Sequence, residues 1–130
     1  MAHVLIVEDD KLLNQAYQLI LEKEGHEVDV AENGREALDL VKESEPEVIL
    51  LDLQMPEMGG LEFLENYDLS KHKHTTVVIL SNVGDEKEIQ KGLEMGAYKY
   101  IVKAQATPIQ LSVLVNNLIH KNIENKPSAA

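Results

Sequence analysis

Five short apolar runs alternate along this chain with longer segments in which apolar residues recur every three or four positions. The runs suit strands that are buried on both faces, and the longer segments carry the apolar stripe of a helix. Strands that alternate with helices form a parallel sheet with right-handed crossovers and helices on both faces. The pattern therefore predicts a single α/β domain of order (βα)5 with a doubly wound, five-stranded parallel sheet.

Local signals give the expected limits of these elements. Gly25, Pro46 and Gly96 end helical segments, while Thr107 and Pro108 have the residue types of a helix N-cap and first helical position. We expect the domain to cover residues 1–124 and a flexible polar tail to follow at 125–130. The expected strands are Val4–Val7, Val28–Ala31, Val48–Leu51, Thr76–Leu80 and Tyr98–Val102.

The composition is typical of a soluble globular protein, with 44% hydrophobic and 27% charged residues in a chain of 130. No apolar run approaches the roughly 20 residues that cross a bilayer, and Met1 leads into a strand without a signal-like segment. The chain has no cysteine, which excludes disulfides and thiolate metal sites. We expect a cytoplasmic protein that does not bind membranes.

The formal net charge is −11, and the lysines are scattered among acidic residues rather than gathered in a basic stripe. Such a chain repels a phosphate backbone. Direct binding to nucleic acid is therefore not expected.

Polar side chains follow four of the expected strands. Glu8-Asp9-Asp10 comes after the first strand, Asp52 after the third, Ser81-Asn82 after the fourth and Lys103 after the fifth. The carboxyl ends of parallel strands meet at one edge of the sheet, where α/β proteins bind their ligands. We therefore expect these groups to form one site.

Several carboxylates in one crevice repel each other unless a cation or a shared proton lies between them. With oxygen ligands and no nearby histidine or cysteine, the expected cation is Mg²⁺. Asp52 would then be a nucleophile that forms an acyl phosphate, with Ser81 and Lys103 contacting phosphoryl oxygens. Taken singly, each residue has an ordinary alternative role as a helix-terminal acid, a cap, a turn residue or a surface lysine.

These segments together resemble the receiver domain of two-component response regulators, closest in architecture to the single-domain, chemotaxis-type members. The resemblance covers about Val4 to Ile119 and implies the flavodoxin-like version of the (βα)5 fold. It also implies a phosphoprotein of signal transduction, linked by phosphorelay to a histidine kinase or phosphotransfer protein. The motifs that carry it are Val4–Asp10, Leu50–Pro56 followed by Gly60, Ile79–Asn82 and Tyr100–Lys103.

The resemblance assigns a role to each site residue. Asp52 matches the phosphoryl acceptor, and Glu8 and Asp9 match the acidic pair that binds Mg²⁺. Gln54 would add its backbone carbonyl as a further metal ligand.

Three further positions match the family's switch and readout. Ser81 corresponds to the switch hydroxyl, Tyr100 to the aromatic residue that turns inward on phosphorylation, and Lys103 to the lysine of the site. The surface that contacts downstream partners would be the fourth helix, fifth strand and fifth helix, between Asp85 and Ile119.

The chain departs from the family pattern near the lysine and near the switch hydroxyl. Ala104 follows Lys103 where the family usually has a proline in a cis peptide bond, which leaves the position of the lysine amine open. Asn82 stands where a small residue is common, and Gln54 and Val83 occupy positions that tune hydrolysis. The lifetime of the phosphorylated state therefore cannot be transferred from a relative.

The leading hypothesis is a phosphorylation-controlled switch whose only chemistry is its own phosphorylation and slow dephosphorylation, so that it is not an enzyme in the usual sense. One alternative is a receiver that binds partners without phosphorylation, and another is the receiver piece of a longer transcription regulator.

The active form would be a monomer or a phosphorylation-induced dimer. A phosphatase with an aspartate nucleophile is disfavoured because Gln54 cannot donate a proton, and a flavin carrier because Glu8-Asp9-Asp10 would repel the cofactor's phosphate.

Overall fold

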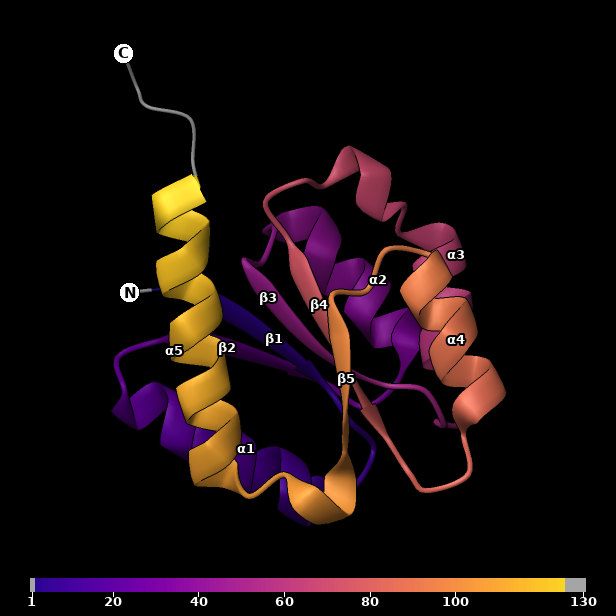
Figure 1. Cartoon of the computed structure of the whole chain (residues 1–130), viewed down its shortest axis with the longest axis horizontal. Coiled ribbons are helices and arrows are strands. Elements are labelled where there is room, and N and C mark those ends of the chain that lie inside the picture. Colours follow the sequence, from indigo (N-terminus) through magenta and orange to yellow (C-terminus); the bar gives the residue numbers. More distant parts are fainter. Residues whose placement is uncertain (1, 126–130) are drawn as a thin grey trace.

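The computed structural model describes residues 2–125, with side chains described through His120, as one five-stranded parallel sheet with helices on both faces (Figure 1). The fold class predicted from the sequence is confirmed. The strands are β1 (His3–Val7), β2 (Glu27–Ala31), β3 (Val48–Asp52), β4 (Thr76–Ser81) and β5 (Lys99–Val102). The helices are α1 (Lys11–Lys23), α2 (Gly34–Glu43), α3 (Gly60–Asn66), α4 (Glu86–Glu94) and α5 (Pro108–Asn125), with two 3₁₀ turns, η1 (Leu69–Lys71) and η2 (Lys103–Gln105).

The strands lie in the order β2-β1-β3-β4-β5, and every neighbouring pair is parallel. The chain moves outward in one direction from β1 to β2 and in the other from β3 to β5, so the order reverses between β1 and β3. A crevice outside the carboxyl ends of the strands is expected at such a reversal. In this register Val7 lies beside Leu51, which brings the residues after β1 next to the end of β3.

Alternate residues of each strand point to opposite faces of the sheet and build two separate cores. Leu5 and Ile49 face α2, α3 and α4, whereas Ile6 and Leu50 face α1 and α5. Figure 1 shows the same division, with α1 and α5 on one side of the sheet and the other three helices opposite. Both faces are apolar, as a buried parallel sheet requires.

Short-range hydrogen bonds fix where the helices begin. The Asp10 carboxylate accepts from the backbone N–H groups of Leu12 and Leu13, and caps α1. The Asn33 side chain accepts from the N–H of Glu36 and caps α2 in the same way. After α1, Gly25 takes a φ of 90°, a left-handed conformation that glycine adopts at little cost.

The strand limits differ from the expected ones by one residue each. β1, β2 and β5 begin at His3, Glu27 and Lys99, and β3 and β4 end at Asp52 and Ser81. The turns η1 and η2 were not expected from the sequence. Asn125 is the last helical residue of α5 rather than the first of a tail, and the remainder of the expected tail, 126–130, lies outside the described residues. No helix within residues 2–125 is both long enough and apolar enough to cross a membrane.

Candidate phosphoryl-acceptor site at the carboxyl edge of the sheet

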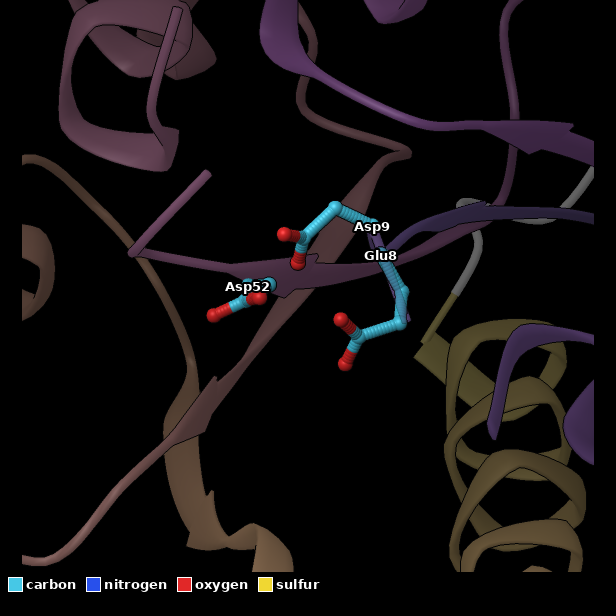
Figure 2. Close-up of side chains that lie close together, drawn as sticks. All are labelled: Glu8, Asp9 and Asp52. Atoms are coloured by element: carbon cyan, nitrogen blue, oxygen red, sulfur yellow. The ribbon is translucent and has the colours of Figure 1, made fainter. Parts of the chain in front are cut away.

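Three acidic side chains meet where β1 and β3 end. Glu8 follows β1, Asp52 closes β3 and Asp9 begins the connection to α1. Each offers a carboxylate oxygen that lies within 4.8 Å of the oxygens offered by the other two. Figure 2 shows these carboxylates converging from two strand ends. The grouping predicted from the sequence is thus present in space.

Burial differs sharply within this acidic group. Glu8 and Asp52 are 0% and 1% exposed, while Asp9 is exposed. Carboxylates are rarely buried to this degree unless a cation or hydrogen-bond donors compensate for the lost hydration. The site must therefore supply such compensation.

Lys103 supplies the compensating charge within the chain. Its Nζ lies 2.8 Å from Oδ2 of Asp52 and 2.7 Å from Oε1 of Glu8, and its side chain is only 17% exposed. The peptide bonds described between residues 2 and 125 include no cis bond, so the loop with Ala104 reaches this position in the trans form. The absence of the usual proline does not prevent the amine from reaching Asp52.

The electrostatics of the pair follow from its burial. Burial, with a smaller contribution from the nearby charge of Glu8, raises the pKa of Asp52 to about 7 against the lowering effect of the hydrogen bond from Lys103. For Lys103, burial acts to lower the pKa, but the hydrogen bonds and charges of Asp52 and Glu8 outweigh it and the net pKa is raised. Asp52 is therefore held in an environment that strongly favours a nearby cation.

The donor set fits Mg²⁺. Three carboxylates lie close together and Lys103 pairs with two of them, so the formal negative charge of these side chains leaves room for a divalent cation. Hard oxygen donors of this kind, one of them solvent-accessible, are what Mg²⁺ prefers, because it retains several of its waters. Glu8, Asp9 and Asp52 would hold the ion. The Gln54 backbone carbonyl remains a predicted ligand, and the Gln54 N–H donates to Oδ1 of Asp52 at 3.1 Å.

Two buried polar residues of α1 support this edge, although their roles were not apparent in the sequence. Asn14 is 6% exposed, and its side-chain amide donates to the backbone carbonyl of Glu8 at 2.9 Å. The Tyr17 hydroxyl donates to the carbonyl of Ala106, in the loop that carries Lys103. Tyr17 lies on the apolar stripe of the helix, so the sequence pattern indicated core packing alone, and no sequence pattern singled out Asn14.

Gly60 allows α3 to approach the end of β3. A Cβ added at this position would collide with the backbone carbonyl oxygen of Asp52 and lie 3.0 Å from the Cα of Leu53. The N–H of Gly60 also donates to the Leu53 carbonyl at 3.1 Å. The residue is therefore a glycine because two backbones meet closely beside Asp52.

The expected switch residues lie on adjacent strands. Ser81 is fully buried at the end of β4, and its hydroxyl donates to the Ile101 carbonyl at 3.4 Å. Tyr100, on β5, is 46% exposed. Asn82 is exposed beside Ser81, and its backbone N–H donates to the Asp85 carboxylate at 3.2 Å. In this conformation the serine hydroxyl is bonded to β5 and the tyrosine faces outward.

The sequence model of the response regulator receiver domain matches residues 4–116. The chain belongs to this family. Receiver domains are signalling modules of two-component systems, and the family uses phosphorylation as its switch. A cluster of three carboxylates such as that of Glu8, Asp9 and Asp52 is typical of Mg²⁺ binding in receiver domains.

Curated relatives support the assignment over most of the receiver domain. The transcriptional regulatory protein SrrA of Staphylococcus aureus is 39% identical over 100 residues, which are 77% of this chain and 41% of SrrA. The chain thus spans less than half the length of this relative.

Solved receiver domains share its fold. The chemotaxis response regulator CheY4 of Vibrio cholerae superimposes with a TM-score of 0.80 at 32% identity, covering 91% of this chain and 98% of the other. A CheY-like receiver domain protein of Methanospirillum hungatei JF-1 gives a TM-score of 0.86 at 25% identity, with coverages of 95% and 98%.

Proposed function

We propose that this receiver domain is a phosphorylation-dependent switch that accepts a phosphoryl group on Asp52 from a histidine kinase or phosphotransfer protein. The observation that carries the proposal is the buried Asp52 carboxylate, which lies 2.8 Å from Lys103 Nζ and within a three-carboxylate group suited to Mg²⁺. The contact with Lys103 also weighs against a receiver that works without phosphorylation, because the altered loop with Ala104 supported that alternative together with Asn82.

The transfer needs little chemistry from the protein beyond positioning and charge. A carboxylate oxygen of Asp52 attacks the phosphorus in line, the bond from phosphorus to the donor breaks, and the leaving group keeps the bonding electron pair. The Lys103 ammonium lies where it can stabilise an oxygen of the transferring group. Mg²⁺, when bound by Glu8, Asp9 and Asp52, supplies positive charge that offsets the charge of the phosphoryl oxygens.

The signal would leave the site through β4 and β5. A phosphoryl group on Asp52 offers new acceptor oxygens, and the Ser81 hydroxyl would turn from the Ile101 carbonyl toward one of them. Tyr100 would then move into the space beside β4. The change would reach partners through α4, β5 and α5, a face on which Tyr98, Tyr100 and Val113 are about half exposed.

The test is a time course with acetyl phosphate, followed by intact-protein mass spectrometry, in Mg²⁺ and in excess chelator. We expect one phosphoryl group per chain in Mg²⁺, a much slower reaction without it, and none in Asp52→Asn. Asp10→Asn is the matched control, since Asp10 caps α1 and asparagine caps a helix equally well. Equal phosphorylation of Asp52→Asn and the wild type would refute the proposal.

A further inference from the structure

The loop that carries Lys103 is held by hydrogen bonds at both ends, but has Ala104 in its middle where the family usually has a proline. At one end Val102 pairs with Ser81 in the sheet. At the other end Thr107 and Gln110 exchange two hydrogen bonds at the start of α5, through the Gln110 N–H to the Thr107 hydroxyl and the Thr107 N–H to the Gln110 side chain. Between these points Ala104 is exposed and has freer backbone torsions than proline.

One hydrogen bond reaches the middle of this loop from the core. Tyr17, which is fully buried on α1, donates its hydroxyl to the carbonyl of Ala106 at 3.3 Å. Ala106 is itself buried at 7% exposure, and its N–H donates to the Lys103 carbonyl at 3.2 Å. A continuous set of contacts therefore runs from α1 through Ala106 to the backbone of Lys103.

We propose that Tyr17 is a positioning residue for Lys103, and that its hydroxyl bond to Ala106 restrains the loop where proline would otherwise do so. The inference rests on the proposed role of Lys103 at the phosphoryl site. The hydroxyl also lies within electrostatic reach of that site. Burial raises the pKa of Tyr17, and the charge of Glu8 raises it further, while that of Lys103 lowers it.

The chain provides a matched control in its second buried tyrosine. Tyr67 is 5% exposed, lies in the core on the opposite face of the sheet, and shares a hydrogen bond of 3.4 Å with the Thr75 hydroxyl. Tyr17→Phe and Tyr67→Phe each remove one long hydroxyl bond and keep the ring. Only the first change affects the Lys103 loop.

Two measurements test the inference. Tyr17→Phe is expected to speed amide hydrogen exchange across residues 103–107, relative to both the wild type and Tyr67→Phe. It is also expected to slow phosphorylation by acetyl phosphate about three- to tenfold, the size of effect of one modest hydrogen bond, while the affinity for Mg²⁺ changes less than about twofold. Tyr67→Phe is expected to phosphorylate at the wild-type rate.

A double-mutant cycle with Lys103→Met separates a positioning role from general damage. If Tyr17 acts through the lysine, Tyr17→Phe causes no further loss of rate in the Lys103→Met protein. The inference would be overturned if the two substitutions reduced the phosphorylation rate independently, so that their effects multiplied in the double variant. It would also be overturned if Tyr17→Phe left amide hydrogen exchange at residues 103–107 unchanged. A wild-type protein that is not phosphorylated at all would refute the proposed function, and the exchange experiment would still decide whether Tyr17 restrains the loop.

Discussion

Contacts between a basic and an acidic side chain lie in opposite environments at the two edges of the sheet. At the carboxyl edge, the side chains of Lys103 and Asp52 are 17% and 2% exposed, whereas toward the amino edge those of His72 and Glu45 are 31% and 49% exposed. The two pairs have similar lengths, 2.8 and 2.7 Å. Burial, rather than the presence of a pair, therefore distinguishes the site.

The physical consequence of this difference is large. Removing one partner of a buried pair leaves an uncompensated charge, which costs about 3–5 kcal/mol, while exposed pairs contribute about 0–1 kcal/mol. Buried carboxylates lower the stability of the metal-free protein, because they have lost their hydration and repel each other. A bound cation relieves both effects, so the carboxyl edge is suited to bind one.

The largest effect is expected from Lys103→Met. This change leaves Glu8 and Asp52 buried without their ammonium partner, and should lower the free energy of unfolding of the metal-free protein by about 3–5 kcal/mol. Urea unfolding in chelator measures the loss. Because Mg²⁺ would replace the missing charge, saturating Mg²⁺ should restore part of the stability. A loss below about 1 kcal/mol would show that the pair behaves as an exposed one.

Asp52→Asn should act in the opposite direction, because it removes one buried carboxylate while Lys103 keeps Glu8 as its partner. It should raise metal-free stability at neutral to alkaline pH by about 1–3 kcal/mol. The folded pKa of about 7 is above the ordinary 3.8, so the protonated carboxyl group favours folding, fully below about pH 4, and this contribution is lost as the group ionises with the pH rising through about 7. The gain from asparagine should therefore be largest above pH 7 and vanish near pH 4. Unfolding curves across this pH range, in chelator, provide the measurement, and a variant that is less stable than the wild type at about pH 8 would contradict the expectation.

Alanine substitutions at Gly60 and Gly25 compare the space available to a side chain at the carboxyl and amino edges of the sheet. Gly60→Ala places a methyl group against the Asp52 carbonyl, and should cost about 1–3 kcal/mol and also slow phosphorylation, because the strand end must shift. Gly25→Ala has open space but a φ of 90°, so it should cost about 1 kcal/mol and leave the phosphorylation rate unchanged. Thermal unfolding and the acetyl phosphate assay on both variants test this. If both variants changed the phosphorylation rate equally, the close approach at Gly60 would have no particular effect on the site.

The smallest effect is expected at the amino edge. Glu45→Gln removes the charge opposite His72, yet stacking of His72 on Tyr67, with ring centroids 4.0 Å apart, remains. The free energy of unfolding should change by less than about 1 kcal/mol, with no change in phosphorylation. A change above about 2 kcal/mol would mean that this edge, too, holds an energetically important charge.

The parts of the site that were predictable are those encoded in local patterns. Apolar runs that end in Glu8, Asp52, Ser81 and Lys103 placed these residues at strand ends, and parallel pairing brings strand ends together whatever the details of packing. The same logic gave the fold class, because strand and helix periods are local properties of the sequence.

The parts that were missed depend on contacts between distant segments. Tyr17 appeared as one more member of an apolar helix stripe, and its hydroxyl partner Ala106 lies 89 residues along the chain. The turn η2 has no strong sequence signal, and only the packed structure shows how a loop with Ala104 presents its lysine. Hydrogen-bond partners of buried groups follow from tertiary packing, which periodicity does not specify.

The most direct test of the account is to locate the phosphoryl group. After incubation with acetyl phosphate and Mg²⁺, reduction with borohydride converts an aspartyl phosphate to a homoserine residue that peptide mass spectrometry can place. We expect conversion at Asp52 alone. Conversion at another carboxylate such as Glu8 or Asp9, or phosphorylated protein without any converted carboxylate, would contradict it.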